Sequence, residues 1–396
     1  MIDSKSQAGL DHLHDAMAAR VAKGELPGMV TLVAHGEDVN VDAIGVMAFG
    51  SNEPMRRDTI FRITSMTKPI LALATMMLVE DGALALDEPV DRLLPELADR
   101  NVLKRIDGPL DETVPAHRPI TALDLLTFRM GNGLLFEPTF DPPYPIVTAA
   151  KDLQLVMGAP DPRTPHDPDE WLKRFGTLPL MYQPGERWQY NTGSLVLSVL
   201  VARASRRSLA DFFKSRIFQP LGMKDTGFWI SEEQSRRLPS QYMTSFQTGK
   251  MELQTQSGVS EWTKPPAFPS GAAGLVSTLD DYLAFARLLL HEGVHENQRL
   301  LSEKSVQLMT KNHLTPEQMA GGGPILAGQG WGFGMAVVTA PDEVSSVAGR
   351  YGWNGGYGTY WFTDPSRSLI AIAMTQTSDV LFNGTMAEFA KLAAHS

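Results

Sequence analysis

The chain has 396 residues, of which 43% are hydrophobic and 20% are charged, so it can bury the core of one large domain or of two that share an interface. Its formal net charge of -10 argues against binding to nucleic acid or to anionic membranes. The absence of cysteine excludes disulfides, thiolate metal sites and cysteine nucleophiles.

The N-terminal 28 residues are predicted to contain an amphipathic helix. They have neither the basic start nor the continuous apolar stretch of a secretory signal. No apolar run in the chain approaches the roughly 20 residues needed to cross a bilayer. The sequence therefore predicts a soluble, cytoplasmic protein. The apolar side chains at helical spacing are Leu10, Leu13, Met17 and Val21.

Two strands and a helix are expected next. Residues 28–50 alternate in polarity like two strands, with a hairpin tip near Gly36. From residue 61 onward the spacing becomes helical, and Gly82 suits the end of that helix. The apolar stripe of this helix consists of Ile70, Leu73, Met76 and Met77.

The middle of the chain alternates between helical patterns and loops. A second helix, predicted over residues 120–133, ends at a glycine cluster. Residues 136–168 are rich in Pro and Asp and longer than an ordinary connection, which predicts a functional loop or lid. Helices are expected again from Thr192 and after a cap at either Ser277 or Thr278.

The C-terminal third reads as successive antiparallel strands followed by a last helix. Strands at both ends and helices between them predict an α/β (α+β) fold, with an antiparallel sheet flanked by helices. We expect residues 1–85 and 185–396 to form the α/β domain. Residues 86–184 would form a mainly helical insertion domain that carries the Pro-rich lid.

Ser65 and Lys68 form the pattern S-x-x-K at the start of the predicted helix. Residues three apart share a helical face, so the lysine amine can reach the serine hydroxyl. A desolvated lysine can act as the base that activates a serine, and the helix N-terminus favours an oxyanion. By itself the pattern occurs by chance about once in a chain of this length. The alternative interpretation is a capping serine beside a surface lysine.

Other segments stand in a fixed order around this pattern. With it, they resemble the serine β-lactamase and penicillin-binding-protein superfamily, and most closely its esterase branch, the family VIII carboxylesterases. The resemblance covers about residues 25–390. The segments that carry it are SMTKPILALATMMLVEDGAL, QPGERWQYNTGSLVLSVLV, FQPLGMKDTGF, PSGAAGLVSTLDDYLAFARLLL, WGFGM and YGWNGGYGTYWFTDP.

The resemblance implies a role for each matching residue. Ser65 would be the nucleophile, Lys68 its base, and Tyr190 the phenol that shares the proton. The backbone N–H groups of Ser65 and Gly356 would form the oxyanion hole. In the wider superfamily an asparagine stands two positions after the tyrosine. Here that position is Thr192 and the asparagine is Asn191, which puts a contact to a substrate amide in doubt.

The third motif departs from the carboxylate-binding members of the superfamily. Where these have Lys-Thr-Gly or His-Thr-Gly, this chain has a tryptophan, which is typical of the esterase branch and presents an apolar wall. Phe128 also stands where the family often has a histidine. The predicted pocket residues are Trp353, Asn354, Gly355, Asn191, Tyr351 and Phe136, with Trp331 as a further candidate wall.

The sequence argues against two other catalytic classes. Residues 291–295 match the zinc motif H-E-x-x-H, but Gly293 is a natural helix terminator, so the two histidines are not expected on one helical face. The nucleophile signature G-x-S-x-G does not occur in the chain, which argues against an α/β-hydrolase.

The sequence thus predicts a carboxylesterase that cleaves short-chain or small-alcohol esters through an acyl-Ser65 intermediate. It would require no metal or other cofactor, and its partner would be a small-molecule ester, with no nucleic acid or membrane. The oligomeric state stays open. The alternatives are a β-lactamase or D-amino-acid peptidase or amidase, an acyltransferase, and a catalytically silent binding domain on the same fold.

Overall fold

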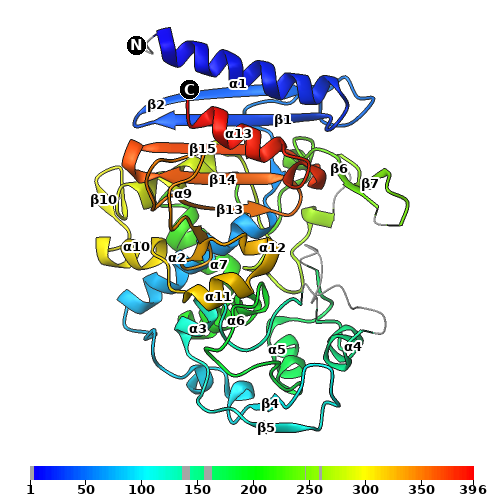
Figure 1. The fold of residues 1–396 in the computed structure, drawn as a ribbon, viewed down its shortest axis with the longest axis vertical. Coiled ribbons are helices and arrows are strands. Elements are labelled where there is room, and N and C mark those ends of the chain that lie inside the picture. The colour runs from blue at the N-terminus through cyan, green and yellow to red at the C-terminus, as the bar shows by residue number, and fades with distance from the viewer. Residues whose placement is uncertain (1–3, 136–142, 156–162, 246, 258–260) are drawn as a thin grey trace.

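The computed structural model describes residues 4–135, 143–155, 163–245, 247–257 and 261–396. The main sheet lies in one half of the molecule, and the described residues between about 86 and 184 occupy the opposite end (Figure 1). No helix in the described ranges is both long and apolar enough to cross a membrane.

Within the described residues, seven antiparallel strands from both ends of the chain form the main sheet. The N-terminal hairpin joins the C-terminal strands by pairing Leu32 with Ile372. This arrangement confirms the predicted antiparallel sheet. Across the sheet the order is β11 (Gly330–Trp331), β12 (Ala336–Val337), β13 (Tyr351–Gly355), β14 (Thr359–Asp364), β15 (Leu369–Met374), β1 (Gly28–His35) and β2 (Asp38–Gly45).

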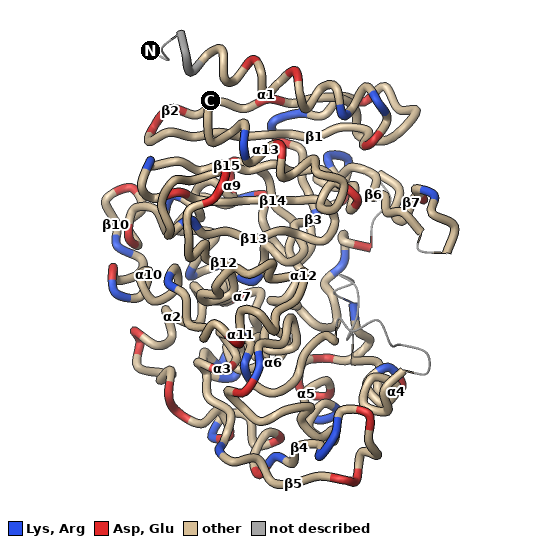
Figure 2. The backbone as a smooth tube through the Cα atoms, viewed as in Figure 1, with Lys and Arg blue, Asp and Glu red and all other residues tan. Residues whose placement is uncertain are grey.

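Helices cover both faces of this sheet, so its central strands are apolar on both sides. Val30 and Leu32 of β1 point into the larger core with α2 (Thr67–Glu80) and α9 (Leu279–Leu290). Met29 and Val33 point to the opposite face, under α1 (Ser4–Ala22) and α13 (Thr385–Ala393). Acidic and basic residues are scattered over the outer parts of the molecule, whereas β13 and β15 carry neither (Figure 2).

The remaining helices lie mostly between the sheet and the far end of the molecule (Figure 1). The predicted helix start at Thr192 is confirmed, and Thr278 rather than Ser277 caps α9. These helices are α3 (Ala122–Leu126), α4 (Pro145–Asp152), α5 (Pro168–Gly176), α6 (Thr192–Ser205), α7 (Leu209–Phe213), α8 (Glu232–Ser235), α10 (Glu303–Thr310), α11 (Pro316–Gly321) and α12 (Gly323–Leu326).

Four short strand pairs complete the fold of the residues that the structure describes. They are β3 (Phe61–Arg62) with β8 (Val276–Ser277), β4 (Asn101–Leu103) with β5 (Thr113–Pro115), β6 (Gln241–Thr244) with β7 (Met251–Thr255), and β9 (Val294–His295) with β10 (Gln298–Arg299). The β9 pair separates the two histidines of the H-E-x-x-H match, because α9 ends before His291 and His295 lies in a strand. The proposed division into two domains stays a prediction.

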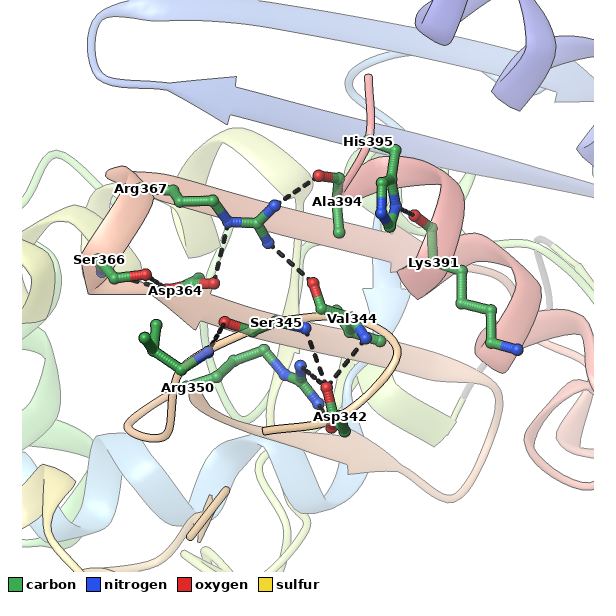
Figure 3. A network of polar contacts seen from close by, with 11 residues as sticks. Asp342, Val344, Ser345, Arg350, Asp364, Ser366, Arg367, Lys391, Ala394 and His395 are labelled. Carbon is green, nitrogen blue, oxygen red and sulfur yellow. Dashed lines mark hydrogen bonds and ion pairs between the residues drawn. The ribbon is translucent and has the colours of Figure 1, made fainter. Parts of the chain in front are cut away.

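An ionic network anchors the start of β13 (Figure 3). Arg350 donates to both carboxylate oxygens of Asp342, at 2.8 and 2.6 Å, and Asp342 also accepts from two backbone N–H groups of its own loop. Arg367 donates to Asp364 of β14 and to the carbonyl of Ala394, the residue directly after α13 in the chain. The network thus ties the loop before β13 to the C-terminal end of the chain.

Candidate active site

Ser65 lies in a short 3-10 turn, η1 (Thr64–Met66), between β3 and α2. Before the turn, the Ile63 N–H donates to the Leu275 carbonyl, which continues the β3–β8 pairing. Thr64 then adopts a φ of 40°, which is strained for a β-branched residue. This reversal of the backbone places Ser65 directly before the first turn of α2.

Lys68 reaches Ser65 from the first turn of α2. Its Nζ lies 2.9 Å from Ser65 Oγ and donates to the Ala272 carbonyl at 2.7 Å. The lysine is only 1% exposed, and no carboxylate of the described residues forms an ion pair with it. Burial therefore holds the pKa of Lys68 well below its ordinary value. An amine in these surroundings can be neutral and can accept a proton.

Tyr190 faces the same serine from the chain segment before α6. Asn191, with a φ of 81°, forms a tight turn in which the Thr192 N–H donates to the Tyr190 carbonyl at 3.2 Å. Such a positive-φ γ-turn is rare and strained. The Tyr190 hydroxyl is hydrogen-bonded to Ser65 and accepts from Trp353 Nε1 at 2.8 Å. Lys68 Nζ lies 4.6 Å from the centre of the tyrosine ring.

Opposing effects act on the acidity of Tyr190. Burial raises the pKa of the phenol to about 12, although the hydrogen bonds with Ser65 and Trp353 lower it. The phenol is therefore protonated at neutral pH in the free protein. It can donate a proton to an oxygen on which negative charge develops.

Aromatic rings enclose Tyr190. Trp353 lies 5.6 Å from it between ring centres, and Phe128 lies at the same distance and almost perpendicular to it. Trp331 packs against Trp353 at 4.7 Å and is fully buried, so it supports Trp353 from behind. Trp188 completes the group at 5.8 Å from Tyr190. Phe128, to which the sequence alone assigned no function, is thus one of the aromatic rings that pack against Tyr190.

Gly355 brings β13 into contact with the nucleophile turn. A Cβ at this position would lie 2.2 Å from the Ile63 carbonyl and 2.1 Å from Thr359 Oγ1, so no larger residue fits. Gly356 follows in the turn between β13 and β14 and is half-buried. This approach brings the two predicted oxyanion segments, at Ser65 and at Gly356, next to each other.

The other predicted pocket residues have different surroundings. Asn354 and Asn191 are half-buried beside Trp353 and Tyr190 in the chain. Tyr351 is buried against Trp361, and its ring contacts among the described residues do not include Tyr190. Phe136 lies outside the described residues. The roles of all these residues stay predictions.

The sequence did not point to one group that the fold brings to the site, the Ala272 carbonyl, nor to a buried cation that precedes the nucleophile turn, Arg62. Ala272 supplies the carbonyl that accepts a hydrogen bond from Lys68. Arg62 is 1% exposed and donates to Pro239 and Gln376, and burial lowers its pKa to about 10. The only sequence feature that could have pointed to Arg62 was its position three residues before Ser65. Among the described residues, no cluster of three or more His, Asp or Glu could hold a metal ion.

The comparison with known proteins identifies the family. A model of the family described as Beta-lactamase matches residues 13–395. The chain belongs to the beta-lactamase family. Protein Rv1367c of Mycobacterium tuberculosis is 39% identical to it over 362 residues, which are 89% of this chain and 86% of that protein. Esterase EstB of Burkholderia gladioli is 32% identical over 377 residues, with the same two coverages.

A solved structure agrees with the fold of this beta-lactamase family member. EstCE1, described as a hydrolase with promiscuous acyltransferase activity, superposes with a TM-score of 0.79, covering 98% of this chain and 99% of its own, at 24% identity. The predicted superfamily and fold class are therefore confirmed. The family and its esterase relatives make the chain a hydrolase of the β-lactamase fold.

Proposed function

We propose that this chain is a carboxylesterase in which Ser65 is acylated by small, uncharged esters. The observation that carries the proposal is the buried contact of 2.9 Å between Lys68 Nζ and Ser65 Oγ. A serine hydroxyl becomes a useful nucleophile only when a neighbouring base removes its proton. Lys68 has the lowered pKa that this task requires.

In the acylation step, neutral Lys68 accepts the hydroxyl proton while Ser65 Oγ attacks the ester carbonyl carbon. The negative charge moves to the carbonyl oxygen, where the backbone N–H groups of Ser65 and Gly356 would stabilise it. The C–O bond to the alcohol then breaks. Tyr190 donates its proton to the departing alkoxide oxygen, and the proton held by Lys68 replaces it.

In the deacylation step, a water molecule attacks the acyl-Ser65 carbonyl. Tyr190 accepts the water proton while it passes its own proton to Lys68, and Ser65 Oγ leaves and takes that proton back from Lys68. The products are the carboxylic acid and free Ser65, so the atoms and charges balance. An alcohol in place of water would give acyl transfer by the same route.

Uncharged esters are the favoured substrates because Trp353 stands where a substrate carboxylate would need a cation. The Trp353 indole is already engaged with Tyr190, and its ring forms an apolar surface. The name of the relative EstB, an esterase, supports the same substrate class. A substrate with a free carboxylate would have to bury that charge against aromatic rings, which is costly.

The test compares hydrolysis of p-nitrophenyl butyrate with that of a chromogenic cephalosporin, for the wild type and for Ser65→Ala. We expect the ester to be the better substrate by kcat/KM, and Ser65→Ala to lose activity about 10⁴-fold or more with an unchanged circular dichroism spectrum. A phosphonate inhibitor should add its mass to the peptide that contains Ser65.

Two of the alternatives, a β-lactamase and an acyltransferase, have their own outcomes in this test. Cephalosporin turnover above ester turnover would favour a β-lactamase. Product ester formed in the presence of an added alcohol, at a rate above hydrolysis, would favour an acyltransferase. Full activity of Ser65→Ala, or an adduct on another residue, would refute the assignment of the nucleophile.

A further inference from the structure

A separate cavity of about 480 Å³ is lined by α7, the turn that follows it and residues 219–229, a part of the chain that supplies none of the site residues above. This volume falls within the range of small-molecule sites, roughly 300–1,000 Å³. Phe218, Met223 and Phe228 form its buried apolar floor, and Trp229 lies at its edge with 41% of its surface exposed. A large exposed aromatic residue beside an apolar floor favours ligand binding.

Two cations stand at the same cavity. Lys214 and Lys224 line it, both are exposed, and neither side chain forms an ion pair within the described ranges. The neighbouring Asp225 is already paired with Arg237. Two lysines without an ion pair beside an apolar cavity are complementary to a ligand that is both apolar and anionic.

The wall that carries Lys214 has an unusual backbone. Directly after α7 the chain forms a π-helical turn, η4 (Lys214–Phe218), in which the Gln219 N–H donates to the Lys214 carbonyl five residues earlier. π-turns are rare and occur frequently at functional sites. Both the first and the last residue of this turn line the cavity.

The cavity connects to the nucleophile turn through backbone pairing. Gly227 exchanges two hydrogen bonds with Val276 of β8, and Val276 pairs with Arg62 of β3, which leads to Ser65. The Phe228 ring also lies 3.0 Å from where a Cβ of Gly274 would stand. Gly274 is two residues from Ala272, the acceptor of Lys68. The Phe228 side chain therefore separates the cavity from the segment that positions the lysine.

We propose that this cavity is a second ligand site, distinct from the Ser65 site, for a medium-chain aliphatic carboxylate. The hydrocarbon chain would lie over Phe218, Met223 and Phe228 and against Trp229. The carboxylate would lie between Lys214 and Lys224. The proposal does not depend on the proposed esterase activity, because it concerns binding alone.

The test measures decanoate binding by calorimetry to Ser65→Ala and to wild-type protein that a phosphonate has blocked at the active site. We expect equal affinity in both, since the cavity is separate. The double variant Lys214→Ala/Lys224→Ala should bind about tenfold more weakly or worse, because charge-assisted contacts to the carboxylate are lost. Decanol should bind more weakly than decanoate to the unaltered cavity.

A matched control and a local readout complete the test. The double variant Lys250→Ala/Lys304→Ala removes two exposed lysines elsewhere and should keep the decanoate affinity. Trp229→Phe should abolish the larger part of the fluorescence change on binding. The proposal is overturned if decanoate fails to bind, if blocking Ser65 abolishes binding, or if the Lys214/Lys224 variant, folded by circular dichroism, binds as tightly as the control variant.

Discussion

Trp353 acts on Tyr190 through a single hydrogen bond. Its Nε1 donates to the phenol oxygen at 2.8 Å, inside a group of aromatic rings where other donors are few. A donor at this oxygen stabilises the phenolate and so lowers the pKa that burial has raised. Trp353 therefore has two tasks in the proposed mechanism: it shapes an apolar wall and it makes the Tyr190 proton easier to transfer.

Trp353→Phe tests this electronic role, since phenylalanine keeps an aromatic ring and removes the N–H. We expect kcat for an ester to fall about 10- to 100-fold, because a hydrogen bond to a charged oxygen contributes about 1.5–3 kcal/mol. The measurement is kcat against pH. Trp331→Phe is the control, since its Nε1 donates to the Leu126 carbonyl instead. Equal losses in both variants would point to packing alone.

Lys68 makes the activity depend on pH in a defined direction. Because burial lowers its pKa, the amine is neutral and able to act as a base at pH values where an exposed lysine is charged. We expect kcat/KM to rise with pH along an acidic limb well below pH 10. A limb that appears only near pH 10 would contradict the role of Lys68.

Lys68→Arg is the matching variant, because arginine keeps the positive charge and cannot be deprotonated at these pH values. Its kcat/KM should fall about 10³-fold or more at every pH, with no acidic limb of the wild-type kind. A thermal unfolding curve close to that of the wild type would show that the loss is chemical.

At the scale of secondary-structure elements, contacts at both ends of β13 fix its position. Gly355 packs its far end against the nucleophile turn, and the Asp342–Arg350 pair holds its near end (Figure 3). Arg350 lowers the pKa of the Asp342 carboxyl to about 2. Because folding lowers this pKa, the contribution to stability is present above the ordinary value of 3.8 and is lost as the pH falls toward 2.

Asp342→Asn should therefore destabilise the protein at pH 7 by about 1 kcal/mol, a figure reduced for solvent screening because the carboxylate is 39% exposed. The difference from the wild type should shrink between about pH 4 and pH 2. Denaturant unfolding at several pH values measures it. Glu343→Gln, which removes a more exposed carboxylate of the same loop, should change stability by less. A difference that does not vary with pH would contradict the assignment.

At the scale of the whole molecule, the two ends of the chain close one face of the sheet. α1 and α13 lie side by side over it (Figure 1), and Gly9 of α1 approaches the backbone of Ser396. Met17 of α1 is fully buried against this face. The stability of the sheet therefore depends on residues far from the site in the chain.

Met17→Ala should lower the free energy of unfolding by about 2–4 kcal/mol, because it removes buried apolar contacts and leaves a cavity. Since the change is remote from Ser65, kcat of the folded protein should stay unchanged. Thermal unfolding and esterase assays at low temperature measure the two effects separately. Asp15→Ala, on the exposed side of the same helix, should stay within about 0.5 kcal/mol of the wild type.

Local patterns in the sequence predicted those features that depend on neighbouring residues. The pairing of Ser65 with Lys68 follows from three-residue spacing at a helix start, and the hairpin at Gly36 follows from alternation around a turn. The antiparallel sheet built from both ends was also predicted, because its strands carry their own apolar patterns. Such features can be predicted because they depend on residues that lie close together in the sequence.

The tertiary structure alone decided which distant residues meet. Trp353 and Tyr190 are 163 positions apart, and their hydrogen bond depends on the register of β13 and on the strained turn at Asn191. The tertiary structure likewise decided the hydrogen bond from Lys68 to the Ala272 carbonyl and the packing of Phe128 against the Tyr190 ring. Such contacts have no local pattern, because strand pairing and helix packing bring the residues together only when the whole core has formed.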